Sequence, residues 1–352
     1  MTVKQAREAA WQWMIEEATR IPGFCAAYTA GSTNWLPDHA ELNPASDLDI
    51  MVVLTDQNPA GRRDKFLYHG ALLEISYLRT DQFQSAERVL SDYHLAPSFR
   101  TTKILFDPMG QLTPFLAPVS REYAQRRWVR QRCANATDKV LAHLRPINEK
   151  TIDEKTTIED QVIACLFAAG VTTHVLLVAG LKNPTVRTRY VAVRDLLADY
   201  GQSEFYEALL QLLGSSRLSR ERARHHLATL VEIFDTAKKS IKTPFPFASD
   251  ISDQARAVAV DGSMELIARG FHREAMFWIG VTHSRCQKVL LQDEPERLTQ
   301  SLKDSYRELL SDLGMSKFSD VRKRGAEIER MLPRVCDEAE KLIAANREIK
   351  NG

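Results

Sequence analysis

The chain has 352 residues, of which 44% are hydrophobic and 26% are charged, as is usual for a soluble globular protein of two or three domains. Its net charge of +1 gives no reason to expect binding of nucleic acid or membranes by the whole molecule. The charge is unevenly placed, because residues 1–120 carry 10 Lys+Arg and 14 Asp+Glu, whereas residues 121–352 carry 37 and 32. We expect the acidic part to suit a metal site and the basic part to help hold a polyanion.

The five cysteines are far apart and form no CxxC pair. This spacing argues against a zinc knuckle and a disulfide framework, and it predicts a reducing, cytoplasmic location. The charged, amphipathic N-terminus does not resemble a signal peptide. Residues 162–181 contain no Asp, Glu, Lys or Arg but include His174, and we predict a buried core helix there rather than a membrane span.

The first 110 residues alternate between helical and strand-like patterns. Helical spacing of apolar residues predicts a helix over 3–20, and a second helical pattern covers 80–91. Short apolar runs predict strands at 24–30, 48–54, 71–78 and 102–106, with a turn at Gly31-Ser32, a polar loop over 33–46 and a turn or loop at 56–64.

From about residue 120 onward the pattern is almost entirely helical. The expected helices are 120–145, 158–181, 186–200, 203–213, 219–240, 251–292, 296–313 and 319–348, with breaks at Pro146, 183–184, 214–216, 244–246 and Gly314. We therefore predict an α/β (α+β) N-terminal domain, 1–118, followed by a larger all-helical C-terminal region, 119–352, with a candidate division near 244–250.

The residues with the clearest chemistry precede and begin the second predicted strand. Asp47 and Asp49 are two residues apart at the start of an apolar strand, so their side chains should share one face. Like charges in that position repel each other unless a cation neutralises them, and carboxylate oxygens suit Mg²⁺. In a mixed sheet a neighbouring strand can bring Glu74 to the same place, which gives three carboxylates for one or two Mg²⁺ ions. A Gly31-Ser32 turn offers backbone N–H groups and a hydroxyl to phosphate oxygens.

This order of motifs resembles the nucleotidyltransferase superfamily of the DNA polymerase beta type. The resemblance covers about residues 20–110 and is closest to the small-molecule branch that includes aminoglycoside and lincosamide nucleotidyltransferases. It implies a small mixed sheet, triphosphate contacts from Gly31 and Ser32, and metal ligands at Asp47 and Asp49. By the same resemblance, Glu74 is the third metal ligand or the general base.

The activity implied by the resemblance is transfer of NMP, with AMP from ATP as the first expectation, to a hydroxyl of a small molecule, with release of pyrophosphate and with two Mg²⁺ ions. An antibiotic is one candidate acceptor. Transfer of NMP to a protein or tRNA, as in nucleotidyltransferase toxins, is an alternative, although the near-neutral charge argues against nucleic acid. A catalytically degenerate nucleotide-binding or regulatory module is another. We expect no membrane partner, and a homodimer is compatible with the sequence.

Several of these residues have plainer interpretations. Asp47 and Asp49 could be polar residues of a turn at the start of a strand, and Ser32 could be an ordinary turn residue. Glu74 could be an exposed strand residue or could pair with an arginine such as Arg79. The loop from Thr33 to Ser46 is longer than the family pattern, and its Trp35 and Asp38 are candidates for a part in substrate choice.

The helical region adds weaker candidates. Glu159 and Asp160 could supply a base toward the acceptor hydroxyl, as an acid of the helical domain does in the aminoglycoside branch, or could simply be acids in the first turn of a helix. Arg187 and Arg189 stand at the start of the next helix and could bind phosphate, or could be solvated surface charges.

Overall fold

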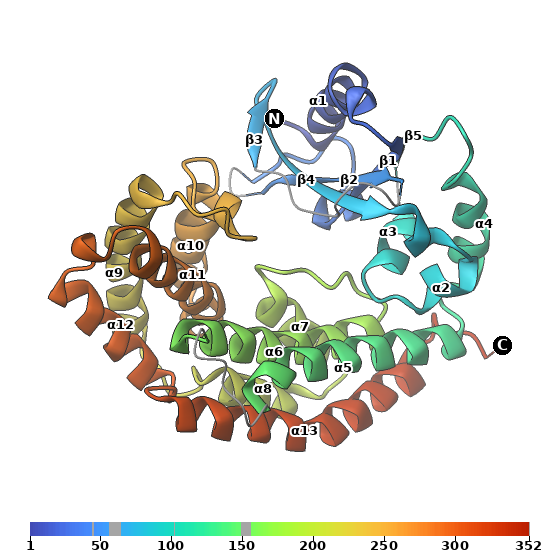
Figure 1. The fold of residues 1–352 in the computed structure, drawn as a ribbon. Coiled ribbons are helices and arrows are strands. Elements are labelled where there is room, and N and C mark those ends of the chain that lie inside the picture. Colours follow the sequence, from blue (N-terminus) through green and yellow to red (C-terminus); the bar gives the residue numbers. More distant parts are fainter. Residues whose placement is uncertain (44–45, 56–64, 102, 149–155, 352) are drawn as a thin grey trace. The chain divides into compact units, whose positions relative to one another are not determined.

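A computed structural model describes residues 1–43, 46–55, 65–101, 103–148 and 156–351. The chain forms two compact units (Figure 1). The N-terminal unit comprises Met1–Arg132, Asn183–Thr185 and Arg347–Gly352, and the helical unit comprises Cys133–Lys182 and Val186–Asn346. The loop predicted at 56–64 and the first residue of the strand predicted at 102–106 lie outside the described residues. The predicted domain boundaries at 118/119 and near 244–250 stay predictions.

A mixed five-stranded sheet forms the centre of the N-terminal unit, with the order β3-β4-β2-β1-β5. Only β2 and β4 run parallel, and the other neighbouring strands are antiparallel. This sheet, followed by a mostly helical region, confirms the predicted fold class. Two strands have the bounds predicted from the sequence. The strands are β1 (Phe24–Ala30), β2 (Leu48–Leu54), β3 (Phe66–Tyr68), β4 (Ala71–Arg79) and β5 (Ile104–Phe106).

Helix α1 (Val3–Glu16) covers one face of this sheet. It begins with a capping box formed by Thr2 and Gln5, and its buried face packs against β2 and β4. Trp13 belongs to this core together with Leu48 and Ile50 of β2. Because successive strand residues point to opposite faces, the burial of Leu48 and Ile50 under α1 directs Asp49 to the other face.

Aromatic side chains pack on that second face. The Tyr28 ring of β1 lies 5.2 Å from Phe99 and 6.2 Å from Phe83, measured between ring centroids. Phe83 ends a short 3₁₀ helix and Phe99 lies in a helix that the sequence pattern did not predict. The helical elements that follow β4 in this unit are η3 (Thr80–Phe83), α2 (Ala86–Ser91), α3 (Leu95–Thr101) and α4 (Thr113–Glu122).

The observed helices differ from the predicted ones at a proline and at a glycine. Helix α5 (Arg126–Asn148) continues through Pro146, where a break was predicted. Pro146 removes one backbone N–H donor from this helix, and α5 nevertheless continues to Asn148. The single helix predicted over 251–292 is divided instead, because Gly270 adopts φ 91° and ends the first part.

Helix α6 (Ile158–Ala179) is the central helix of the helical unit. It is long and apolar enough to cross a membrane, yet 83% of its most apolar window is buried, as a core helix requires. It packs against α13, α11, α7 and α8. The remaining helices are α7 (Arg189–Asp199), α8 (Ser203–Leu213), α9 (Arg220–Ser240), α10 (Gly262–Ala268), α11 (His272–Asp293), α12 (Gln300–Asp312) and α13 (Phe318–Ala345). The short 3₁₀ helices are η1 (Ala18–Arg20), η2 (Ser32–Trp35), η4 (Ala248–Asp250) and η6 (Pro295–Arg297), and η5 (Ala257–Asp261) is a π-helix.

Helix α11 carries a buried histidine. His283 is 0% exposed, and its ring lies 5.4 Å from that of Tyr306. Burial is the main cause that lowers its pKa to about 3, and the nearby His226 lowers it further. The folded protein therefore holds this imidazole neutral.

We expect Trp13→Ala to lower the free energy of unfolding of the N-terminal unit by about 3–5 kcal/mol, because it leaves a cavity between α1 and the sheet. The matched control is Trp11→Ala, which removes the same side chain from the same helix at a position that is 50% exposed. Urea unfolding followed by circular dichroism measures both. Equal losses in the two variants would contradict the packing described for α1.

We expect His283 to make stability depend on pH below about 6.5. In that range the unfolded chain binds a proton that the folded chain refuses, so stability is lost as the pH falls from about 6.5 toward about 3. In thermal unfolding, the stability of His283→Leu should depend less steeply on pH. The slope of stability against pH should fall by the equivalent of at most one proton. His39→Leu, at an exposed position, is the control and should keep the wild-type slope. Identical slopes in His283→Leu and the wild type would contradict the assignment.

Candidate functional site

The strand register places a row of charged residues across one face of the sheet. In the parallel pair of β2 and β4, Asp49 lies opposite Glu74. In the antiparallel pair of β3 and β4, Phe66 lies opposite Leu73, so the next step along the ladder brings Lys65 opposite Glu74. Directly paired residues have Cβ atoms about 4.5–5.5 Å apart, and the row therefore brings together side chains of β2 and β4 with Lys65, which immediately precedes β3.

Asp47, Asp49 and Glu74 form an acidic cluster. One carboxylate oxygen of each residue lies within 4.8 Å of the others. Asp47 immediately precedes β2 and has a side chain that is 21% exposed, whereas the Glu74 side chain in β4 is 3% exposed. The structure thus brings together the three acids that the sequence singled out. Such concentrated negative charge is unfavourable in a buried place without cations.

Lys65 supplies one cation to this cluster. Its Nζ donates to Asp47 Oδ2 and to Glu74 Oε2, and its side chain is 5% exposed. The alternative that Glu74 belongs to an ion pair is therefore correct, but the partner is Lys65. Arg79, which the sequence suggested, pairs with Asp81 instead.

The sequence interpretation missed Lys65 because it missed β3. The sequence offered a signal in the dipeptide His69-Gly70 between two apolar segments, and in the structure both residues have positive φ, of 47° and 81°. Two such residues between two strands form the tight turn of a β-hairpin. A hairpin centred on this turn fixes the register of β3 on β4 and places Lys65 opposite Glu74.

Gly31 leaves the space that the Asp49 carboxylate fills. A Cβ atom built on Gly31 would lie 1.9 Å from Asp49 Oδ2, and the backbone of Gly31 has φ 73° and ψ −165°, a region that is almost exclusive to glycine. Both the space and the conformation therefore require glycine. The turn predicted as a phosphate contact lies directly against one of the acids.

The turn after Gly31 is held by a buried polar pair. Asn34 donates from Nδ2 to the Thr29 carbonyl at 2.6 Å, and the Thr29 hydroxyl donates to Asn34 Oδ1 at 2.7 Å. These bonds tie η2 to the strand from which it emerges. Ser32 begins η2 and is exposed, so its hydroxyl is accessible to a ligand.

The long loop after Ser32 packs on the start of α1. The Arg7 guanidinium donates to the Thr33 carbonyl at 2.8 Å and pairs with Asp38, and the Lys4 backbone N–H donates to the Asp38 carbonyl at 3.0 Å. Trp35 lies under the Arg100 guanidinium, 5.6 Å from the ring centroid. These contacts give Asp38 and Trp35 structural partners, and their part in substrate choice stays a prediction.

The acidic cluster fits a divalent cation by its donor set. All three side chains offer the hard oxygen ligands that Mg²⁺ prefers, and they come from two adjacent strands and one strand-start residue. Gly31, which has no side chain, leaves room for the Asp49 carboxylate beside its backbone. These residues could hold Mg²⁺.

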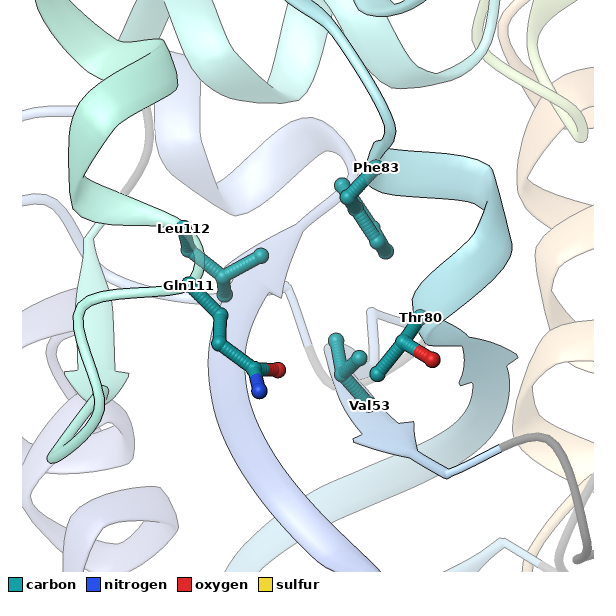
Figure 2. Close-up of a pocket in the computed structure, with 5 residues that line it drawn as sticks. All are labelled: Val53, Thr80, Phe83, Gln111 and Leu112. Atoms are coloured by element: carbon teal, nitrogen blue, oxygen red, sulfur yellow. The ribbon is translucent and has the colours of Figure 1, made fainter.

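A small pocket lies farther along the same face (Figure 2). It has a cavity of about 260 Å³ and is lined by Val53, Thr80, Phe83, Gln111 and Leu112. Val53 is four residues beyond Asp49 in β2, which places it about 13 Å along the strand. The pocket is smaller than the 300 Å³ or so at which ligand pockets usually begin, so the acidic cluster carries the functional argument.

In the helical unit, both arginine candidates contact their own unit. Arg187 donates from Nη1 to the Gly262 carbonyl at 3.3 Å. Arg189 is 2% exposed, donates from Nε to the Val186 carbonyl at 2.7 Å, and lies over the Phe277 ring at 4.2 Å. Arg189 is therefore not the solvated surface charge that the sequence analysis offered as the alternative, whereas Arg187 is partly exposed. Their role in phosphate binding stays a prediction.

The two acids of the helical unit differ in their surroundings. Asp160 forms a capping box with Thr157 at the start of α6 and pairs with Lys288. Glu159 is 4% exposed, and burial raises its pKa. Because Asp160 is engaged by Thr157 and Lys288 and burial raises the pKa of Glu159, Glu159 is the stronger candidate base of the two.

We expect Gly31→Ala to weaken divalent-metal binding at least about tenfold, because its Cβ must displace the Asp49 carboxylate. The control is Gly110→Ala, which has a similar φ of 64° but open space around the new methyl group. Mn²⁺ titration by calorimetry measures both variants. The interpretation fails if both bind Mn²⁺ as tightly as the wild type, or if Gly110→Ala loses as much affinity as Gly31→Ala.

Comparison with known proteins adds no family assignment. No protein-family model matches the chain, and no curated protein matches its sequence. The resemblance to nucleotidyltransferases therefore rests on the residues of this chain alone.

Proposed function

We propose that this protein is a metal-dependent nucleotidyltransferase that transfers NMP from a nucleoside triphosphate to a hydroxyl of a small molecule and releases pyrophosphate. The observation that carries the proposal is the meeting of Asp47, Asp49 and Glu74 beside the Gly31 turn. This combination joins a donor set for Mg²⁺ to a backbone turn that can approach phosphate oxygens.

In this reaction the acceptor oxygen bonds to the α-phosphorus, and the bond from that phosphorus to the oxygen bridging to the β-phosphate breaks. The acceptor proton goes to a carboxylate, and pyrophosphate leaves. Mg²⁺, when bound, neutralises phosphate charge. The three acids hold the cation, and Gly31 and Ser32 position the triphosphate. Catalysis of this kind depends on positioning and on electrostatic stabilisation.

Three acids, Glu74, Glu159 and Asp160, are the candidates for the base. Glu74 belongs to the acidic cluster but is held by Lys65. Glu159 belongs to the helical unit and has a pKa raised by burial. By the resemblance, an acid of the helical region, Glu159 or Asp160, is the counterpart of the base in the aminoglycoside branch. ATP is the first nucleotide to test, and an antibiotic hydroxyl is the first acceptor.

A second candidate function is supported by Lys65. Lys65 bridges two of the three acids, so an internal ion pair occupies part of the site. This arrangement is compatible with a nucleotide-binding or regulatory module that has no turnover. Such a module would bind nucleotide and release no pyrophosphate with any acceptor. Transfer to a protein or tRNA keeps the same site and differs only in the acceptor.

We expect pyrophosphate release to require Mg²⁺, a nucleoside triphosphate and a hydroxyl acceptor from a panel of aminoglycosides and lincosamides. Asp49→Asn should reduce this rate by at least about 100-fold, because it removes a charged ligand from the metal and phosphate site. Pyrophosphate is measured in a coupled assay with each of the four nucleotides.

The matched control is Asp81→Asn, which removes a carboxylate of the same unit that pairs with Arg79 and lies outside the acidic cluster. It should keep the wild-type rate. An Asp49→Asn variant with the wild-type rate would refute the metal assignment. Binding of MgATP without turnover on any acceptor would favour the module instead.

A further inference from the structure

The small pocket of the N-terminal unit lies where the two parallel strands end. Strands β2 and β4 run side by side to their last residues, where Leu54 pairs with Arg79. Val53 lines the pocket from the end of β2, and Thr80 lines it from the first position after β4. Open α/β sheets bind ligands in crevices outside the carboxyl ends of their strands. Asp49 lies about 13 Å back along β2, so the pocket is separate from the acidic cluster.

Another wall of this pocket is a loop that one carboxylate holds in place. Asp107 follows β5 and accepts from the backbone N–H groups of Gln111 at 2.7 Å, Leu112 at 3.1 Å and Thr113 at 2.8 Å. It also accepts from the Thr113 hydroxyl at 2.6 Å. The backbone that carries Gln111 and Leu112 is therefore fixed before a ligand arrives. A preformed wall of this kind lowers the entropy cost of binding.

The lining combines a buried apolar floor with a polar rim. Val53 and Leu112 are 1% and 0% exposed, and Phe83 is packed by its ring against Tyr28. Gln111 is exposed, and its side chain extends from the loop toward the side formed by Val53 (Figure 2). Cavities that stay empty in proteins are apolar. A pocket with a carboxamide at its rim is therefore suited to hold water or a polar ligand.

The size and the chemistry of the pocket define a class of ligand. Its volume of about 260 Å³ equals that of roughly nine water molecules in the liquid. A molecule of similar bulk has about ten non-hydrogen atoms, which is too few for a whole nucleotide and enough for one fused ring system. Gln111 offers an acceptor, Oε1, beside a donor, Nε2, and this pair matches an amine next to a ring nitrogen, as on adenine. The Phe83 ring can contact such a heterocycle edge to face or offset.

We propose that this pocket is a further binding site, which takes a planar heterocycle of purine size with an amine beside a ring nitrogen. The ring contacts Phe83 over the floor formed by Val53 and Leu112, and its amine edge meets the Gln111 carboxamide. The site goes beyond the proposed function and does not depend on the acidic cluster. A free base and the base of a nucleotide present the same chemistry, and the experiment distinguishes these two sources.

The test is a titration of the full-length protein with adenine, followed by saturation-transfer NMR of the ligand. We expect the wild type to bind adenine saturably and Gln111→Leu to bind it at least about tenfold more weakly, because leucine removes both hydrogen-bonding groups. Gln111→Trp should abolish binding by filling the mouth of the pocket. The matched control is Gln12→Leu, which changes an exposed glutamine of α1 and should keep the wild-type affinity.

A second ligand separates recognition of the amine edge from an effect on the shape of the pocket. Purine has the same rings without the amine, so its affinity should fall less than that of adenine when Gln111 is replaced by leucine. Equal losses for the two ligands would overturn the contact with Gln111. Absence of saturable adenine binding by the wild type would overturn the site, as would equal adenine affinity in Gln111→Leu and the wild type.

Competition with ATP identifies the source of the heterocycle. Displacement of bound adenine by ATP would assign the pocket to the base of a nucleotide, and adenine that stays bound at saturating ATP would assign it to a free base. Both results support a heterocycle site. Asp49→Asn should bind adenine with the wild-type affinity even where it loses metal binding, so the proposed function and this site can fail separately. Loss of adenine binding in Asp49→Asn would overturn the independence of the pocket.

Discussion

The pairing of β2 with β4 is the constraint on which the candidate site depends. These strands are parallel, and their register sets Asp49 beside Glu74. A shift of that register by one residue would turn Glu74 into the core under α1 and bring Leu73 to the acid face. The apolar residues Leu73 and Ile75, which are 0% exposed, prevent this shift because they must stay buried. The hydrophobic core thereby fixes the position of the acids.

Because of this register, the two faces of the sheet have different roles. One face buries its apolar residues against α1 and supplies the stability of the unit. The other face carries the acids at the start of β2 and packs aromatic rings around Tyr28. A site placed on strands is held more rigidly than one placed on loops, which matters for an arrangement in which ligand atoms must converge. Among the described residues, the Gly31 turn is a loop element that lies against Asp49, and Asn34 anchors it.

The sequence predicted these features to different degrees. The strands 24–30 and 48–54 were predicted with their observed bounds, because the apolar runs of their sequences coincide with the buried strands. Strand β3 has three residues and was missed, since periodicity needs a longer run to be visible. The acids were predicted from their residue types and order. Lys65 was not, because its place depends on a hairpin register that connects two segments through one turn.

The sequence analysis treated an ion pair and a metal site as alternatives for Glu74. In the structure Glu74 pairs with a lysine and also lies in a group of three acids, so the two interpretations do not exclude each other. A buried glutamate with one lysine would satisfy the first, and a cluster of acids alone would suggest the second. In the described part of the chain, Lys65 contacts Glu74, and Glu74 also lies near Asp47 and Asp49. Removing the acids in favour of apolar residues would cost the sheet little, as buried ionic groups seldom stabilise a fold on balance. The meeting of three acids beside a glycine turn is therefore the feature on which the proposed metal site rests.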